Sequence, residues 1–457
     1  MSKETLLTKK KLADFIKKSN DVTYIDSSIR LNNFNNISTD SRKISKGDIF
    51  IALDGENFEG HNFISEALSS GAEFCISTKR NSLPKQITVN STLDFIQHFA
   101  SYLVESTPKL KTFGITGTNG KTSTKEILKN IISKQSNVLA THGNLNNQIG
   151  LPLTIFNLTG MHEFLILEMG TNSKGEIENL AKIAKPHFAT ITNIGKGHTE
   201  GLINKKNIFF EKLNITKYFD EESTFSFNMD DKFINDFYSK LNCKKISYGI
   251  INEADVTAKN ISDNFSSFDL CYKNSNYPIS LKAPGLNNIY NSLCSATLAI
   301  AANIEIELII SGINSFQGIE NRFRITNLTR GNIIINDTYN ANPDSTVRAI
   351  EMVKKMFPQK KKIAILGSML ELGKESALEH QKIGEQIKLN DFDELFSYGD
   401  NSDDYNKNLD FNTKFIALES HSDIKKHINL NSLDNTVILV KGSRGMKMEK
   451  IINSLGL

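Results

Sequence analysis

The segment F-G-I-T-G-T-N-G-K-T-S, at residues 113–123, combines the residue types that bind a nucleotide phosphate. Glycines let backbone N–H groups fold around an anion, and a helix start adds partial positive charge. In such loops the lysine contacts the β- and γ-phosphates, and the hydroxyl after it binds Mg²⁺. The segment therefore predicts an ATP or GTP site with Lys121 on the phosphates and Thr122 on the metal. The whole predicted loop comprises Gly117, Thr118, Asn119, Gly120, Lys121, Thr122 and Ser123.

The surroundings of this loop fit a strand that leads into a helix. Ile127, Leu128, Ile131 and Ile132 recur at helical spacing after the lysine. The strict pattern G-x-x-x-x-G-K-[ST] requires a glycine where Ile115 stands. An ordinary glycine-rich turn is therefore the alternative, but the Gly-Lys-Thr core and its context favour nucleotide binding.

Two polar turns follow neighbouring predicted strands, at the sheet edge where open α/β sheets bind ligands. Glu168 follows the apolar run 164–167 and would bring a carboxylate for Mg²⁺ beside the loop. His198 lies in a glycine-rich turn after the run 188–193 and could ligate a metal or orient a ligand. Without the loop, Glu168 would be better explained as a solvated side chain at a strand end, and a lone histidine such as His198 is more often structural or merely exposed.

The C-terminal third of the chain repeats this arrangement. A polar run from Asn336 to Asp344 follows its first predicted strand, and Pro343 suits a helix start. This turn predicts a site that faces the central unit, whereas a capped helix, with Asn342 or Asp344 bound to backbone N–H groups, is the alternative. The basic turn at 441–445 suits a substrate carboxylate, although a merely solvated loop explains it as well.

Alternating strand and helix patterns predict an α/β protein of three domains. Residues 1–107 form a small N-terminal domain that ends at a Ser-Thr-Pro break. Residues 108–325 form a central, mononucleotide-binding domain with a mainly parallel sheet, a β-rich stretch at 224–282 and a helix at 291–302. Residues 326–457 form a doubly wound, Rossmann-like domain, but no G-x-G-x-x-G follows its first strand, so no dinucleotide is expected there. Its strands are predicted at 333–335, 363–366, 395–398, 414–418 and 436–440.

The composition limits the partners that this chain can have. Its 457 residues carry a formal net charge of only +3, which gives no electrostatic basis for binding nucleic acid or an anionic membrane. The four cysteines show no C-x-x-C pair, and the lysine-rich start has no apolar core of a signal peptide. We therefore expect a cytoplasmic protein, and we expect a monomer.

These segments, in this order, resemble the ATP-dependent Mur ligases of bacterial cell-wall synthesis over essentially the whole chain. The G-T-N-G-K-T run at 117–122 is similar to the shorter phosphate loop of that family, which accounts for Ile115. The runs E-M-G at 168–170 and T-N-I-G at 192–195, with His198, are similar to its metal-site segments. The resemblance implies ATP and Mg²⁺ as cofactors.

The same resemblance implies roles for residues that no local pattern singles out. Lys212 falls where the family has a carbamylated lysine that bridges metal ions, together with Thr122, Glu168 and His198 as ligands. Asn288 matches the family asparagine that contacts adenine. The hypothesis that follows has Asn288, Arg322 and Asp337 close on the base, phosphates and ribose of the nucleotide. From the residues alone, Lys212 is simply a lysine on a predicted helix.

Within the family, three segments are most similar to members that join D-alanyl-D-alanine to a UDP-N-acetylmuramoyl-tripeptide. They are D-T-Y-N-A-N-P-D-S at 337–345, G-S-M-L-E-L-G at 367–373 and V-K-G-S-R at 440–444. The resemblance implies that an acyl phosphate forms on the tripeptide and is then attacked by the amine of the dipeptide. The residues implied in substrate binding are Ser41 and Arg42 for the UDP-sugar, and Asn340, Asn342 and Arg444 for the dipeptide.

Two alternatives stay open from the sequence. A sister ligase of the same architecture, another Mur ligase or a folylpolyglutamate synthase, would share the loop and the domain order. The ligase that adds the third amino acid typically has D-N-P-R where this chain has A-N-P-D at 341–344, which argues against that member. A nucleotide-dependent switch would share the loop alone, and its GTP-binding form is disfavoured because no N-K-x-D guanine signature follows.

Overall fold

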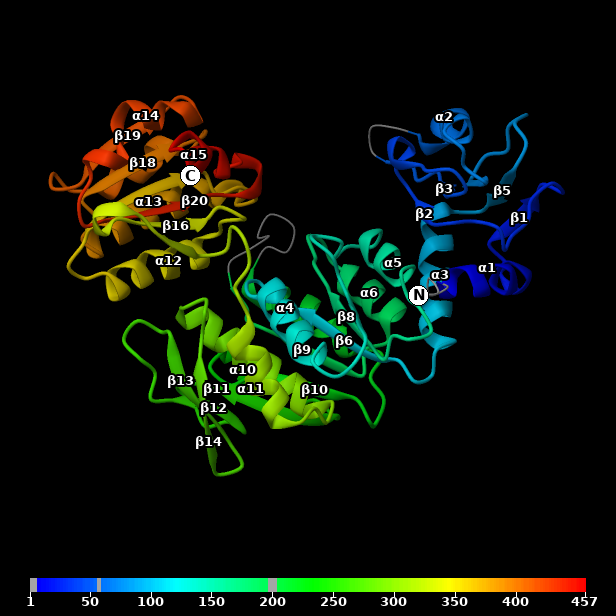
Figure 1. Cartoon of the computed structure of the whole chain (residues 1–457), viewed down its shortest axis with the longest axis horizontal. Coiled ribbons are helices and arrows are strands. Elements are labelled where there is room, and N and C mark those ends of the chain that lie inside the picture. The colour runs from blue at the N-terminus through cyan, green and yellow to red at the C-terminus, as the bar shows by residue number, and fades with distance from the viewer. Residues whose placement is uncertain (1–5, 56–58, 196–203) are drawn as a thin grey trace.

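The computed structural model describes residues 6–55, 59–195 and 204–457. The chain forms three α/β units, and the central unit lies between the N-terminal unit and the C-terminal unit (Figure 1). Each unit has a sheet of its own, built from consecutive strands of the chain. The predicted three-domain α/β architecture is confirmed.

The N-terminal unit has a five-stranded sheet in the order β1-β5-β4-β3-β2, in which only β1 runs antiparallel to its neighbour. Its strands are β1 Val22–Ile25, β2 Ile37–Ser38, β3 Ile49–Ile51, β4 Phe74–Ser77 and β5 Gln86–Val89. Its helices are α1 Leu7–Lys18, α2 Ile64–Ser69 and α3 Thr92–Glu105. Helix α3 also packs against two helices of the central unit, so the apolar core runs continuously across this boundary.

The central unit has a nine-stranded sheet in the order β14-β13-β12-β11-β10-β9-β6-β8-β7. The predicted β-rich stretch is present, but β10, β11 and β12 are parallel and extend the main sheet, and only β13 and β14 are antiparallel. Strand β6 lies inside the sheet, and all its residues after the first are buried, as expected for an apolar parallel strand. The strands are β6 Lys111–Thr116, β7 Val138–Ala140, β8 Phe164–Glu168, β9 Phe188–Ile191, β10 Thr224–Asn228, β11 Lys244–Gly249, β12 Val256–Lys259, β13 Ser267–Tyr272 and β14 Ser275–Ser280.

Helices cover this sheet and carry several predicted site residues. The helix predicted from Asn291 begins five residues earlier, because it follows directly on Gly285, whose φ of 140° few other residues adopt. Its small residues allow close packing on α4, where Ser295 Oγ donates to the Thr124 carbonyl at 3.0 Å. The helices are α4 Lys121–Ile132, α5 Gly150–Ile155, α6 Glu176–Ala184, α8 Lys205–Leu213, α9 Lys232–Asn235, α10 Leu286–Ala301 and α11 Ile306–Ser315.

The C-terminal unit has a six-stranded sheet in the order β15-β16-β20-β17-β18-β19. The predicted strands are confirmed, and an additional strand, β15, pairs antiparallel with β16 at the edge. Strand β15 has a single apolar residue and is largely exposed, so no apolar run signals it in the sequence. The strands are β15 Arg324–Asn327, β16 Ile333–Asp337, β17 Lys361–Gly367, β18 Glu394–Tyr398, β19 Lys414–Leu418 and β20 Thr436–Lys441, and the helices are α12 Pro343–Met356, α13 Ser376–Leu389, α14 Ile424–His427 and α15 Glu449–Ser454.

Two further features bear on the sequence-based expectations. Across the described ranges, no helix is both long enough and apolar enough to span a bilayer. All four cysteines are free thiols.

Candidate active site

A cavity of about 870 Å³ lies between the central unit and the C-terminal unit. Both units contribute to its wall, because the phosphate loop lines one side and the turn after β16 lines the other. The predicted site residues that line it are Thr118, Asn119, Gly120, Lys121, Thr122, Ser123, Glu168, Asn288, Arg322, Asp337, Asn340 and Asn342.

The phosphate loop connects β6 to α4, as predicted, and its two glycines are required by their surroundings. Gly117 has φ 145°, and a Cβ there would overlap Thr192 Oγ1. Gly120 has φ 83°, and a Cβ there would lie 2.5 Å from Asn291 Oδ1. Ile115 is fully buried inside β6, so the loop begins two residues later than in the longer pattern. That position therefore has no need of a glycine.

The residues that follow strand β9 hold the loop by hydrogen bonds. Thr118 N donates to the Asn193 carbonyl at 2.9 Å, and Asn119 N donates to Asn193 Oδ1 at 3.0 Å. The Asn119 carbonyl accepts from Thr192 Oγ1 at 2.5 Å and from Asn193 Nδ2 at 3.0 Å. The T-N-I-G run at 192–195 therefore fixes the shape of the loop.

Two cationic side chains, those of Lys121 and Arg322, donate hydrogen bonds to the loop. Lys121 Nζ donates to the carbonyls of Gly117 and Thr118 at 2.7 and 3.1 Å. Arg322 Nη2 donates to Thr122 Oγ1 at 2.9 Å, and its guanidinium lies 3.9 Å from the centre of the Tyr339 ring. Burial lowers the pKa of Lys121, with Arg322 acting in the same direction and a nearby carboxylate opposing. This concentration of positive charge suits a polyphosphate.

Glu168 ends β8 at the bottom of the same cavity. Its Oε1 accepts from Asn146 Nδ2 at 2.9 Å, and its backbone N–H donates to Thr141 Oγ1 at 3.0 Å. Its Oε2 is buried and has no hydrogen-bond partner among the described residues. The nearest cation is the fully buried Lys125, whose Nζ lies 4.0 Å from Oε2 and donates to the Thr141 carbonyl at 2.6 Å. A buried carboxylate oxygen without a partner suits a hard cation such as Mg²⁺.

Lys212 is buried on α8, close to the phosphate loop. Burial and the nearby Lys121 ammonium lower the pKa of Lys212 well below its usual value, and Glu211 opposes them. Glu211 holds this part of α8 in place, because its two carboxylate oxygens accept from Gly175 N at 2.8 Å and Ile177 N at 2.9 Å. Those N–H groups belong to the start of α6, where a carboxylate is favoured. The fixed position of Lys212 thus depends on a neighbour whose role the sequence did not reveal.

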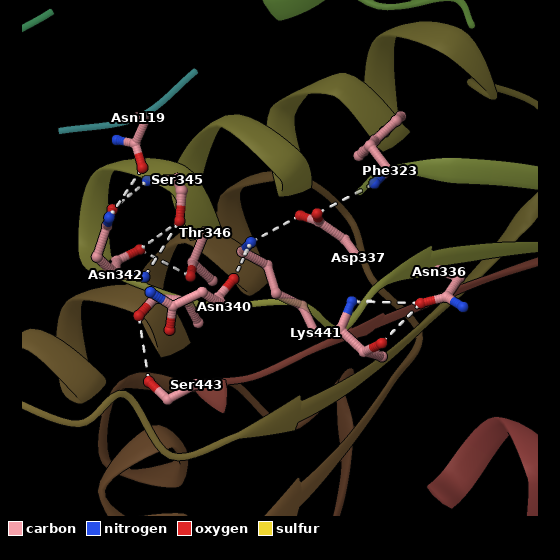
Figure 2. A network of polar contacts seen from close by, with 12 residues as sticks. Asn119, Phe323, Asn336, Asp337, Asn340, Asn342, Ser345, Thr346, Lys441 and Ser443 are labelled. Atoms are coloured by element: carbon pink, nitrogen blue, oxygen red, sulfur yellow. Dashed lines mark hydrogen bonds and ion pairs between the residues drawn. The ribbon is translucent and has the colours of Figure 1, made fainter. Parts of the chain in front are cut away.

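The turn after β16 forms the opposite wall of the cavity (Figure 2). Asp337 Oδ2 pairs with Lys441 Nζ at 2.6 Å, and Asp337 Oδ1 accepts from Phe323 N at 3.1 Å. Lys441 also donates to the Asn340 carbonyl at 2.9 Å. Arg444 N donates to Asn340 Oδ1 at 3.3 Å, so the basic turn lies beside this wall although the Arg444 side chain is exposed.

Asn342 both caps a helix and faces the central unit, as the two interpretations of its turn required. Its Oδ1 accepts from Ser345 N at 2.9 Å, and its own backbone N–H donates to Ser345 Oγ at 3.1 Å, which forms a capping box at the start of α12. Its Nδ2 donates to Asn119 Oδ1 at 2.9 Å, so the cap residue also reaches the phosphate loop (Figure 2).

Some predicted residues lie away from the cavity. Ser41 Oγ donates to Glu66 Oε2 at 3.1 Å, and Arg42 pairs with Asp40 at 2.8 Å, both in the N-terminal unit. The structure does not bring Ser41 or Arg42 to the cavity wall. His198 lies outside the described residues.

Sequence reasoning missed a second carboxylate on the cavity wall, Asp230. Asp230 follows β10 and accepts from Ile250 N at 2.6 Å, Asn252 N at 2.8 Å and Tyr290 OH at 2.8 Å. Burial raises the pKa of Asp230, but these backbone N–H groups outweigh it and hold the pKa below its usual value. The strand-end rule that identified Glu168 would also have identified Asp230 if β10 had been recognised as part of the parallel sheet.

Comparison with known proteins places this geometry in a family. Three family descriptions match successive parts of the chain: Mur ligase family, catalytic domain, over 33–104; Mur ligase middle domain over 115–299; and Mur ligase, glutamate ligase domain, over 321–444. The chain belongs to the Mur ligase family. The resemblance that the motifs suggested is confirmed.

Several of the similar proteins are named for one reaction. The UDP-N-acetylmuramoyl-tripeptide–D-alanyl-D-alanine ligases of Buchnera aphidicola subsp. Baizongia pistaciae and Bacillus subtilis are 35% and 30% identical, with 92% of each chain covered in both cases. A crystal structure of MurF from Acinetobacter baumannii has a TM-score of 0.86 at 28% identity and covers 92% of this chain and 93% of its own. MurF from Thermotoga maritima in complex with ADP has a TM-score of 0.83 at 26% identity, with 92% and 97% covered.

Proposed function

We propose that this Mur ligase uses ATP to join D-alanyl-D-alanine to UDP-N-acetylmuramoyl-tripeptide, a step of peptidoglycan precursor synthesis. Its relatives named for this reaction match 92% of the chain. The observation that carries the proposal is the cavity shared by a phosphate loop and the turn after β16, since amide synthesis needs a nucleotide and an acyl acceptor held together. ATP as the nucleotide is supported by the ADP complex of the similar Thermotoga protein.

In the first step, a carboxylate oxygen of the tripeptide attacks the γ-phosphorus. The bond to the β-phosphate oxygen breaks, so an acyl phosphate forms and ADP leaves. Lys121 and the N–H groups of the loop bind the phosphates, and Arg322 adds positive charge where negative charge develops. Asn288 and Asp337, which also line the cavity, are proposed to contact the base and the ribose.

In the second step, the neutral amine of the dipeptide attacks the acyl carbon. The C–O bond to the phosphate breaks, phosphate leaves, and the new amide loses the surplus amine proton. Asn340 and Asn342 on the turn after β16, and Arg444 beside it, are the proposed dipeptide contacts. A guanidinium such as that of Arg444 suits the carboxylate end of the dipeptide.

Mg²⁺ is the proposed metal, with Thr122, Glu168, Lys212 and His198 as the residues that would hold it. The described residues contain no cluster of three His, Cys, Asp or Glu side chains. Mg²⁺ commonly takes one or two carboxylates and completes its shell with phosphate oxygens and water. The buried oxygen of Glu168 that accepts no hydrogen bond, and the hydroxyl of Thr122, supply such ligands. When bound, Mg²⁺ would neutralise charge on the phosphates.

Carbamylation of Lys212 is supported by its environment. Only a neutral amine adds CO₂, and burial beside Lys121 favours the neutral form. The carbamate would place a negative charge next to Lys121, where a protonated Lys212 would be repelled. Mass spectrometry of the intact protein under CO₂, with Lys212→Ala as control, measures the modification directly.

The roles of the units complete the proposal. Residues 1–107 would bind the UDP-sugar with Ser41 and Arg42, 108–325 the ATP, and 326–457 the dipeptide. Ser41 and Arg42 lie off the cavity wall, so we propose that they bind the UDP-sugar end of the substrate while its tripeptide extends into the cavity. We propose a cytoplasmic monomer.

The decisive experiment measures the release of ADP and phosphate by the purified chain with saturating Mg²⁺ and ATP. We expect release only when UDP-N-acetylmuramoyl-tripeptide and D-alanyl-D-alanine are both present, with one new amide detected by mass spectrometry. Activity with a shorter nucleotide precursor and a single amino acid would instead identify a sister ligase. Hydrolysis that is independent of both substrates would identify a nucleotide switch.

A further inference from the structure

The tip of the phosphate loop makes a direct contact with the C-terminal unit. Asn119 Oδ1 accepts from Asn342 Nδ2 at 2.9 Å (Figure 2). The backbone of Asn119 is already held by Thr192 and Asn193, so only its side chain is directed across the boundary. The contact therefore joins a rigidly held loop to a separate unit of the chain.

The orientation of the Asn342 amide is determined by its capping role. Its Oδ1 must face the Ser345 N–H, which can only donate, so its Nδ2 must face Asn119. The oxygen of this amide stabilises the start of α12, and its nitrogen bonds to the loop. The two functions can therefore be separated by substitution.

A second contact lies next to the first. Asp344 Oδ2 is 3.8 Å from Lys205 Nζ at the start of α8, and a Cβ on Gly195 would lie 2.5 Å from the same oxygen. The Asp344–Lys205 pair is partly exposed and contributes little by itself. It shows, however, that Asp344 as well as Asn342 lies against the central unit, so the Asn342–Asn119 bond is not an isolated contact.

We propose that Asn342 is a positioning residue that couples the C-terminal unit to the nucleotide loop through Asn119. The cavity wall comes from both units, so a bound nucleotide and the Asn342–Asn119 bond favour the same arrangement of the units. Loss of the bond must then weaken nucleotide binding, because more of the nucleotide's interaction energy is used to bring the units together. The expected ligation kinetics rest on the proposed function, whereas the expected change in ADP affinity does not.

The test is a double-mutant cycle on the full-length chain, with Asn342→Asp, Asn119→Ala and the combined variant. Aspartate keeps the cap on Ser345 N but has no N–H to donate, and Asn342→Ser, also a good cap, is the matched variant without added charge. We expect each single variant to weaken ADP binding about fivefold in isothermal titration calorimetry, the effect of one ordinary hydrogen bond. The combined variant should bind ADP no more weakly than the weaker-binding single variant. The thermal unfolding temperature without nucleotide should be unchanged for Asn342→Ser.

Additive losses in the cycle would overturn the proposal, because they would mean that the two residues act independently. Ligation kinetics provide a second readout. In Asn119→Ala, which alters no proposed dipeptide contact, coupling predicts a lower kcat and weaker ATP binding with the KM for D-alanyl-D-alanine unchanged. Normal kcat and normal ATP binding in Asn119→Ala would overturn the coupling and leave Asn342 with its proposed dipeptide contact alone. If the variants show non-additive losses of ADP binding but the wild-type chain forms no amide, the proposed function fails and the coupling stands.

Discussion

The sharpest structural prediction concerns Glu211, which precedes the proposed metal-bridging lysine. Its carboxylate accepts from Gly175 N and Ile177 N at the start of α6 and is almost completely buried. Glu211→Gln keeps the size of the side chain but replaces one acceptor oxygen by an NH₂ group. One of the two backbone N–H groups then faces a donor and loses its partner.

The cost follows from two terms. A buried N–H group without a partner costs about 1–3 kcal/mol. Loss of a negative charge at a helix start removes about 0.3–1 kcal/mol more. We therefore expect Glu211→Gln to lower the free energy of unfolding by about 2–3 kcal/mol, the centre of the summed range. Because α8 is no longer held firmly on α6, Lys212 should shift and kcat for ligation should fall about tenfold to a hundredfold.

Two measurements check this reasoning. The chain has no tryptophan, so circular dichroism follows urea unfolding. Because three units need not unfold as one, hydrogen–deuterium exchange over 172–180 gives the local readout. Glu178→Gln is the matched control, because it removes a charge from the first turn of the same helix but leaves no buried N–H group without a partner. It should lower the free energy of unfolding by no more than about 0.3–1 kcal/mol and leave kcat unchanged. Unchanged exchange protection together with lost ligation would refute the anchoring role and place Glu211 in the chemistry itself.

The remaining predictions concern the loop and its metal. Lys121→Met should abolish ADP release with the circular dichroism spectrum unchanged, because the phosphates lose their cation; normal turnover would exclude the role. Gly120→Ala should weaken ADP binding far more than Gly143→Ala, since both have positive φ but only the first would meet an atom, Asn291 Oδ1; equal losses would contradict this argument. Chelation of Mg²⁺ should stop ligation reversibly, and Glu168→Gln should raise the Mg²⁺ concentration needed for half-maximal rate; an unaltered metal requirement would remove Glu168 from the ligands.

Features that depend on contiguous residues could be read from the sequence. The phosphate loop is such a feature, because Gly117, Gly120 and Lys121 act through the backbone shape of a few successive residues. Buried parallel strands are another, because strands covered on both faces appear as apolar runs. Most of the strands were recognisable for this reason. The exposed edge strand β15 was missed because it has no such run.

Features that depend on residues far apart in the chain appeared only in the folded molecule. Arg322 meets Thr122 across 200 positions, and Asn342 meets Asn119 across 223. Such pairs are set by how sheets and helices pack, which no local pattern encodes. The lowered pKa of Lys212 likewise comes from burial and from Lys121, and both are properties of the assembled core. The sequence therefore identifies the types of the reactive groups. Which groups pair, and whether they are protonated, depends on which distant segments the fold brings together.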